Sequence, residues 1–215
     1  MLVILLGPPG SGKGTQARSL SEKLKIPHIS TGDILRESIK LNTDLGRKAS
    51  RFLEKGELVP DQVMLKIVEE RLRKTDCENG FLLDGFPRTI AQTKDLDNVL
   101  KKISRDINLV VELEVRDNVV VERLLSRLIC VGCDANFNLD SNPPKIKERC
   151  DSCGGKLEYR TDDSEEVIRR RLKVYHEQIE PIKDYYKKQG KLVVVNGEGK
   201  AEETLKQILE MIKKR

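Results

Sequence analysis

The stretch LVILLGPPGSGKGTQ, residues 2–16, decides the fold of this chain. Its apolar run from Leu2 to Leu6 predicts a buried β-strand, and the glycine-rich turn that follows leads into a helical pattern beginning at Lys13. Successive backbone N–H groups of such a turn can point into one concavity, and the N-terminus of the next helix adds a favourable field for an anion. Because Lys13 can reach the β- and γ-phosphates of a nucleotide, we interpret the stretch as a phosphate-binding loop.

One position of this loop departs from the strict pattern. Gly14 follows the lysine where Ser or Thr is usual, and the hydroxyl of Thr15 comes one residue later. The departure argues against direct ligation of a metal by a loop hydroxyl. The alternative interpretation is an ordinary glycine-rich turn between a strand and a helix, and the strand, loop, lysine and helix in register disfavour it.

Apolar runs and helical patterns alternate along the rest of the chain. Strands are expected near residues 27–30, 81–84, 108–115 and 191–196, and helices near residues 33–41, 45–55, 90–103, 118–128, 164–189 and 201–214, with one more after Pro60. Strands separated by helices indicate a parallel sheet. We therefore predict an α/β fold of three layers, with a five-stranded parallel sheet and helices on both faces.

A second motif, FLLDGFPR, covers residues 81–88. Asp84 ends a predicted buried strand, so it would lie beside the phosphate loop and could hold magnesium through water. Gly85 permits close approach of the backbone, and Arg88 offers a bidentate clamp for phosphate. Taken alone, the motif could equally be a strand followed by a Gly-Pro turn.

The cysteines form two pairs, Cys130-x₂-Cys133 and Cys150-x₂-Cys153, separated by residues 134–149. Two such pairs predict a tetrahedral thiolate site, with structural zinc as the default metal and iron as an alternative. Disulfides are disfavoured in a chain expected to be cytosolic. Cys77 is left over and is interpreted as a free, buried thiol.

The amino-acid composition argues against a nucleic-acid-binding protein and against a membrane protein. The 215 residues include 40 Lys and Arg against 35 Asp and Glu, interleaved along the chain, with four Phe, four Tyr and no Trp. A dedicated nucleic-acid binder would concentrate its basic residues and offer aromatic platforms. The apolar run Leu2–Leu6 is too short to span a membrane and lacks the basic flank of a signal peptide, so we expect a cytoplasmic protein without a membrane partner.

Three stretches together resemble the motifs of the adenylate kinase family: GPPGSGKGTQ at residues 7–16, ISTGDILR at 29–36 and LLDGFPRT at 82–89. The resemblance covers essentially the whole chain and is to the long-lid bacterial type. It implies a nucleotide-biosynthesis enzyme that reversibly transfers the terminal phosphoryl group of MgATP to AMP, giving two ADP. It also implies a monomer with a core domain (residues 1–29, 60–125 and 164–215), an AMP-binding insert (30–59) and a zinc-binding lid (126–163).

The resemblance also implies site residues. The ATP site would comprise Gly10, Ser11, Gly12, Lys13, Gly14, Thr15, Arg123, Arg127, Asn136, Phe137 and Gly199. The AMP site would comprise Thr31, Arg36, Glu57, Leu58, Val59, Gly85, Phe86, Pro87, Arg88, Gln92, Arg160 and Arg171. The charges acting in catalysis would be Lys13, Arg36, Arg88, Arg123, Arg160 and Arg171, and Asp33 and Asp84 would hold magnesium through water.

Several of these residues have structural alternatives. Thr31 could be a helix N-cap, and His28 is expected to be structural, with no visible partner. Arg123 and Arg127 are expected four apart on one helical face, although a run of charges usually marks a solvated helix face. Arg169 and Arg170 are expected to face solvent.

Two other functions stay open from the sequence. One is a kinase for another monophosphate or donor, which Thr31 and Gln92 disfavour because they match the adenylate form. The other is a zinc-ribbon module that binds nucleic acid or a protein and keeps an unused nucleotide site. Scarce aromatic residues and dispersed charge disfavour that module.

Overall fold

The structure is a computed structural model that describes residues 1–214, and its centre is a parallel β-sheet. In spatial order the strands are β2 (His28–Ser30), β3 (Phe81–Asp84), β1 (Leu2–Leu6), β4 (Leu109–Glu114) and β8 (Leu192–Asn196). Every adjacent pair is parallel. The prediction of a five-stranded parallel sheet is confirmed.

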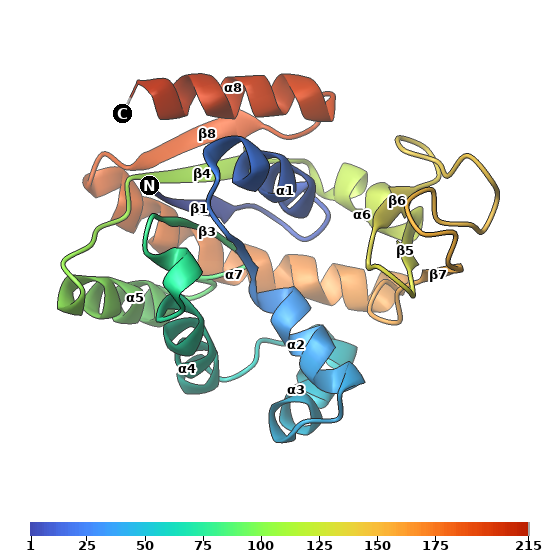
Figure 1. Ribbon diagram of the computed structural model, residues 1–215, viewed down its shortest axis with the longest axis horizontal. Helices are drawn as coiled ribbons and strands as arrows, with labels where there is room; N and C mark the ends of the chain where they lie inside the picture. The colour runs from blue at the N-terminus through green and yellow to red at the C-terminus, as the bar shows by residue number, and fades with distance from the viewer. Residues whose placement is uncertain (215) are drawn as a thin grey trace.

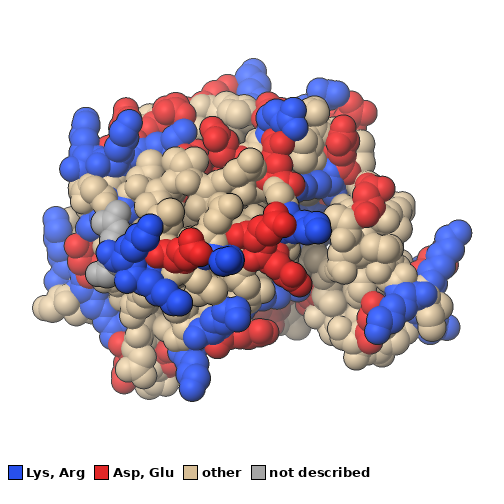
Figure 2. Space-filling model, turned by 90° about the horizontal axis from the view of Figure 1, so that it is seen from above, with Lys and Arg blue, Asp and Glu red and all other residues tan. Residues whose placement is uncertain are grey.

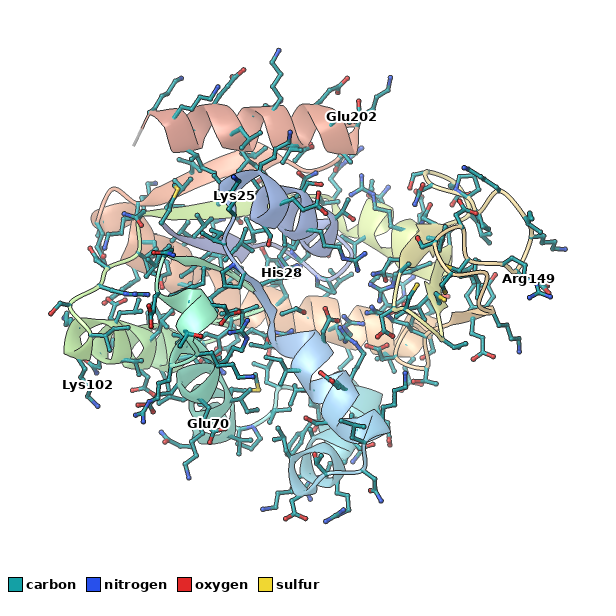
Figure 3. All side chains as sticks on the ribbon, in the orientation of Figure 1. Lys25, His28, Glu70, Lys102, Arg149 and Glu202 are labelled. Atoms are coloured by element: carbon teal, nitrogen blue, oxygen red, sulfur yellow. The ribbon has the colours of Figure 1, made fainter. Side chains whose placement is uncertain are left out.

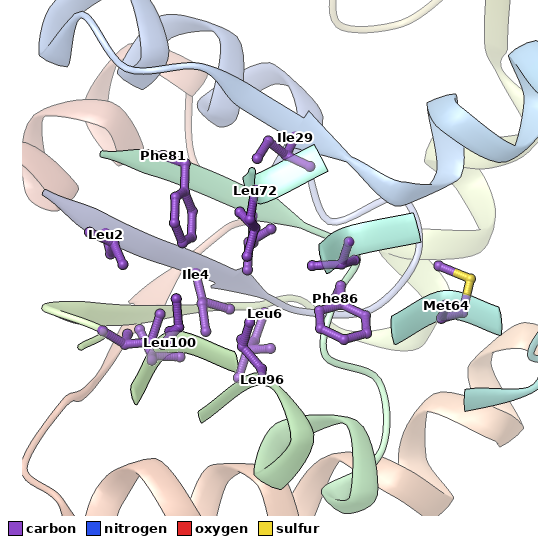
Figure 4. Close-up of a cluster of buried hydrophobic side chains, with 14 of the residues drawn as sticks. Leu2, Ile4, Leu6, Ile29, Met64, Leu72, Phe81, Phe86, Leu96 and Leu100 are labelled. Carbon is purple, nitrogen blue, oxygen red and sulfur yellow. The ribbon is translucent and has the colours of Figure 1, made fainter. Parts of the chain in front are cut away.

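Helices cover both faces of the sheet (Figure 1). One layer contains α1 (Lys13–Leu24) and α8 (Ala201–Lys213), and the other contains α4 (Asp61–Leu72), α5 (Ile90–Lys102) and α7 (Glu165–Lys188). Side chains of a strand alternate between faces. Val3 and Leu5 therefore pack with α1 and α8, whereas Leu2, Ile4 and Leu6 pack with α4, α5 and α7. Figure 4 shows the second cluster around β1 and β3.

Two segments project from this three-layer body. The helices α2 (Thr31–Lys40) and α3 (Asp44–Lys55) form a hairpin after β2. After α6 (Asp117–Leu125), the strands β5 (Arg127–Cys130), β6 (Asn136–Asn138) and β7 (Leu157–Tyr159) form a small antiparallel sheet. Figure 2 shows this second segment as a separate lobe, and acidic and basic side chains are intermixed over the face in view. A short 3₁₀ helix, η1 (Thr75–Cys77), precedes β3.

The structure corrects the expected helix over residues 118–128. Helix α6 ends at Leu125, and Arg127 lies on β5, so Arg123 and Arg127 do not share a helical face. The reason is non-local pairing: residues 127–130 pair with both β6 and β7, which local periodicity cannot reveal. The other predicted helices and strands agree with their predicted bounds to within about two residues, the usual uncertainty of element ends, whereas β5, β6, β7 and η1 were not predicted.

A second correction concerns the start of α2. The Ser30 hydroxyl accepts the N–H of Asp33, so Ser30 is the N-cap and Thr31 is the first helical residue. The N-cap interpretation of Thr31 is therefore wrong, and its hydroxyl is available for another contact. Within residues 1–214, no helix is long and apolar enough to cross a membrane.

Candidate active site

A cleft of about 1010 Å³ opens at the carboxyl ends of β1 and β3. The loop after β1, the loop after β3, the start of α2 and the small sheet of β5 and β6 all contribute to its lining. A smaller adjoining pocket of about 60 Å³ lies between the α2–α3 hairpin and the loop after β3. Ligands of parallel α/β sheets bind at this end of the strands, so the two cavities are the candidate site.

The loop after β1 has the geometry expected of a phosphate cradle. Gly12, the N-cap of α1, has a φ of 93°, a left-handed conformation that L side chains rarely adopt. The Lys13 ammonium donates hydrogen bonds to the carbonyl oxygens of Gly7 and Pro8, both at 2.8 Å. Burial lowers the pKa of Lys13 to about 8, although the Asp84 carboxylate opposes the shift. A bound anion would favour the charged form of this lysine.

The loop after β3 lies directly beside this cradle. Asp84, the last residue of β3, is aligned with Leu5 of β1, and a β-carbon added to Gly14 would lie 3.6 Å from its Oδ2 atom. His28 Nε2 lies 3.2 Å from the same oxygen. His28, labelled near the middle of the view in Figure 3, is partly exposed and lines the cleft. It was expected to have no partner, so that expectation is wrong.

The smaller pocket is built around one carbonyl group. The Gly85 oxygen accepts hydrogen bonds from Thr31 Oγ1 at 2.9 Å and from Arg88 Nε at 2.7 Å. Gly85 has a φ of 76°, and an added β-carbon would lie 2.9 Å from the Arg88 guanidinium. Gln92, only 2 % exposed, accepts the backbone N–H of Arg88 at 2.7 Å. These contacts bring ISTGDILR and LLDGFPRT into one site.

Guanidinium groups of the cleft are held by nearby oxygen atoms. Arg127 makes a bidentate pair with Asp163, with N–O distances of 2.7 and 2.8 Å. Arg171 contacts Asp163 and Asp162 at 3.3 Å, and Arg36 pairs with Asp33. Arg123 instead donates to the backbone oxygens of Gly197 and Glu198, at 2.9 and 3.2 Å.

Several cationic side chains lie close together in this cleft, where loss of hydration and mutual repulsion disfavour their charged forms. Although the Arg88 side chain is exposed to the solvent of the cleft, desolvation by the dense surroundings, together with repulsion from Arg171, lowers its pKa to about 10. Burial, together with repulsion from Arg127 and Arg36, lowers the pKa of Arg160 to about 9. The Nε atom of Arg160 is buried and has no hydrogen-bond partner, while its Nη2 donates to Asn136 at 3.2 Å. An anion of high charge would relieve both the repulsion and the unmet hydrogen bond.

Most residues named from the sequence line these two cavities. The large cleft contains all eleven positions expected for ATP and both acids expected for magnesium: Gly10, Ser11, Gly12, Lys13, Gly14, Thr15, Arg123, Arg127, Asn136, Phe137, Gly199, Asp33 and Asp84. The small pocket contains Thr31, Arg36, Glu57, Leu58, Val59, Gly85, Arg88, Gln92 and Arg171. Pro87 and Arg160 line the large cleft. The Phe86 side chain is 1 % exposed and packs in the core instead. Arg169 and Arg170 are exposed, as expected.

The four paired cysteines lie together, and none of them lines the cleft. Their Sγ atoms are all within 4.8 Å of one another, with Cys130–Cys153 at 3.4 Å and Cys133–Cys150 at 3.5 Å. Tetrahedral zinc with Zn–S bonds of about 2.3 Å requires sulfur–sulfur separations of roughly 3.8 Å, so the donor set fits. Backbone N–H groups of Gly132 and Ser152 point at sulfur atoms of the two pairs. Cys77 is fully buried in the core.

Sequence reasoning missed the acids that hold the arginines. Asp162 and Asp163 were noted only as neighbours of Arg160, yet each contacts Arg171, and Asp163 is buried. Burial raises the pKa of Asp162, but Arg171 and Arg36 outweigh it and hold that pKa below the usual range. Two acids directly after an arginine were the available signal, since buried carboxylates need cationic partners. Asp61, which contacts Gln92, gave no sequence signal beyond that of a first-turn helix acid.

The cradle, the second motif and the paired cavities define a phosphate-loop nucleotide-binding protein with room for two ligands. The family model described as adenylate kinase matches residues 5–191. The chain is 51 % identical over 212 residues to adenylate kinase of Caldicellulosiruptor bescii, covering 99 % of each chain. It is 50 % identical over 214 residues to that of Thermosipho melanesiensis, covering 100 % of each, and 49 % identical over 214 residues to that of Archaeoglobus fulgidus, covering 100 % and 99 %.

The chain therefore belongs to the adenylate kinase family. It is a nucleoside monophosphate kinase, and its reaction is phosphoryl transfer between ATP and AMP. The phosphate-loop fold and the function inferred from the sequence are confirmed.

Proposed function

We propose that the large cleft binds MgATP, that the small pocket binds AMP, and that transfer proceeds directly from one nucleotide to the other. The cluster of mutually repelling cationic groups around Lys13, Arg88 and Arg160, partly desolvated where they line the cleft, carries this proposal. Such charges are costly in the free protein and favourable once phosphates arrive.

The chemistry needs no general base from the protein. The phosphate oxygen of AMP is the nucleophile and is already ionised at neutral pH. Catalysis then consists of aligning two nucleotides and stabilising negative charge that spreads over the transferring group. We assign that stabilisation to Lys13, Arg36, Arg88, Arg123, Arg160 and Arg171. The position of Arg88, shared by both cavities, supports a role at the junction of the two nucleotides.

Two metals complete the proposal. Mg²⁺ would accompany ATP and be held through water by Asp84 and Asp33, whose carboxylates line the cleft beside the cradle. When bound, it neutralises phosphate charge. Zinc would be held by the four lid cysteines as a closed, structural site with no position for a reacting water.

We propose that residues 30–59 act as the AMP-binding insert and residues 126–163 as a lid over a core made of residues 1–29, 60–125 and 164–215. The projection of both segments from the sheet body supports this division (Figure 1). Closure of the lid over the cleft would exclude water, which otherwise competes with AMP as acceptor. We further propose a monomeric, cytoplasmic protein without nucleic-acid partners.

A coupled assay of ADP formation tests the acceptor assignment. With saturating MgATP, kcat/KM is measured for AMP, GMP, CMP and UMP. We expect a strong preference for AMP, because a base that cannot match the polar groups of the pocket leaves them unpaired. Equal turnover with CMP or UMP would show that the pocket does not read adenine.

A further inference from the structure

The strongest unassigned feature is a carboxylate behind the small pocket. Asp61, in the first turn of α4, does not line the pocket, yet its Oδ1 atom accepts a hydrogen bond from Gln92 Nε2 at 2.7 Å. Its Oδ2 atom accepts one from Thr89 Oγ1 at 2.9 Å. Thr89 is the N-cap of α5 and Gln92 lies in its first turn, so Asp61 connects the first turns of α4 and α5 beside the pocket.

The direction of every hydrogen bond in this group is determined. Arg88 offers a backbone N–H, which can only donate, and it donates to Gln92 Oε1 at 2.7 Å. An ionised carboxylate can only accept. Thr89 Oγ1 also accepts the backbone N–H of Gln92 at 3.1 Å, so its own proton goes to Asp61. The amide of Gln92 therefore lies between a donor on its oxygen side and an acceptor on its nitrogen side.

This arrangement determines which hydrogen-bonding groups of Gln92 remain for a ligand. The Gln92 amide has two N–H hydrogens and two oxygen lone pairs, and one of each is used by Asp61 and Arg88. One N–H donor and one acceptor remain. The edge of a 6-amino purine offers an acceptor at N1 and a donor at the amino group, whereas a 6-oxo purine offers the reverse.

We propose that Asp61 is a positioning residue that fixes the Gln92 amide in the orientation that selects a 6-amino purine over a 6-oxo purine. To match a 6-oxo purine, the amide must turn over. That would place Nε2 against the Arg88 N–H and Oε1 against the Asp61 carboxylate, two repulsive contacts in place of two favourable ones. Asp61 thus supplies selectivity without touching the ligand. The inference rests on the proposed assignment of Gln92 to the AMP pocket.

The test compares AMP with inosine monophosphate, its 6-oxo counterpart. For wild type, Asp61→Ala and Asp61→Asn, kcat/KM and the calorimetric Kd are measured for both nucleotides. We expect Asp61→Ala to lower the AMP-to-IMP ratio about tenfold or more, mainly through the KM and Kd of AMP, with kcat for saturating AMP within a few-fold. A tenfold change in this ratio is about the effect expected when one hydrogen bond no longer distinguishes the two nucleotides. Asp61→Asn, nearly the same in shape, should fall between, because an asparagine amide can face Gln92 with either end.

Two further variants separate positioning from general damage. In a Gln92→Ala background, adding Asp61→Ala should leave the AMP-to-IMP ratio unchanged, because Asp61 acts through Gln92. Asp44→Asn removes a first-turn carboxylate from α3, where its partner is Arg47, and should not change the ratio. If Asp61→Ala does not fold, Asp61→Asn gives the same comparison.

The outcomes are distinct. An unchanged ratio in both Asp61 variants, while Gln92→Ala loses selectivity, overturns the inference and leaves the AMP site standing. Equal losses for AMP and IMP mean that Asp61 is merely structural. A wild-type protein that does not prefer AMP to IMP removes both the inference and the proposed acceptor site.

Discussion

Replacing Lys13 with methionine should slow phosphoryl transfer and at the same time stabilise the unliganded protein at neutral pH. The lysine is charged below about pH 8 but sits where burial disfavours its charge. A pKa lowered from 10.5 to about 8 corresponds to a cost of roughly 3 kcal/mol at neutral pH. Methionine keeps much of the side-chain volume and removes the charge.

Lost hydrogen bonds offset part of that gain. The lysine donates to the carbonyl oxygens of Gly7 and Pro8, and each bond contributes about 1 kcal/mol. The Pro8 oxygen keeps a second donor, the Ser11 N–H at 3.2 Å. We therefore expect a net stabilisation of about 1 kcal/mol at pH 7, which for a chain of this size raises Tm by about 2–4 °C.

The pH dependence provides the sharper measurement. Between the folded pKa near 8 and the unfolded value of 10.5, the unfolded state binds more protons, so raising the pH stabilises wild type relative to the variant. From pH 7 to 9.5 the difference in the free energy of unfolding between Lys13→Met and wild type should fall by about 2 kcal/mol and change sign. Denaturant unfolding at several pH values measures it, with exposed Lys102→Met as the control. A stability difference that stays constant from pH 7 to 9.5 refutes the reasoning.

Three further perturbations follow from the site. Arg88→Ala should reduce the single-turnover rate about 10²-fold or more while changing nucleotide Kd far less; a raised KM with kcat within a few-fold contradicts its assigned role. Arg127→Ala leaves buried Asp163 with only the 3.3 Å contact of Arg171, but it also removes the repulsion that Arg127 exerts on Arg160. Denaturant unfolding should therefore show a net loss of about 2 kcal/mol, below the roughly 3–5 kcal/mol of a fully broken buried pair. The exposed pair of Arg169 contributes at most about 0.5 kcal/mol, and similar losses for both variants would count against the burial argument. Cys150→Ser should lower zinc content and Tm, yet leave measurable transfer at low temperature; lost chemistry with an unchanged Tm would indicate a catalytic metal instead.

The parts of the fold that the sequence predicted are those encoded locally. The apolar run Leu2–Leu6 is buried on both faces and so reads as a strand without knowledge of its neighbours, and the adjoining glycines mark the loop. The helix start at Lys13 and the turn after Asp84 follow from the same short-range chemistry. These elements position the phosphate cradle, which is why the class of site was predictable.

The parts that were missed depend on contacts between distant residues. Arg127 continues a helical pattern in the sequence but joins a strand because β6 and β7 pair on either side of it. Asp61 lies 28 residues from Thr89 and 31 from Gln92, and locally it is only an acid in the first turn of a helix. His28 likewise has its partner 56 residues away, at Asp84. Side-chain partners of this kind are fixed by packing, which a single sequence does not display.

The acidic partners of two arginines lie between the cleft and the segment proposed as the lid. Asp163 and Asp162 lie between the last lid strand, β7, and helix α7, where they hold Arg127 and Arg171. Both guanidiniums also line the cleft, so we expect nucleotide phosphates to compete with these carboxylates for the same N–H groups. A phosphate that takes over such a guanidinium weakens a contact at the base of the lid. Because a guanidinium has a limited number of N–H groups to share, we expect binding of anions and the position of the proposed lid to be coupled through these residues.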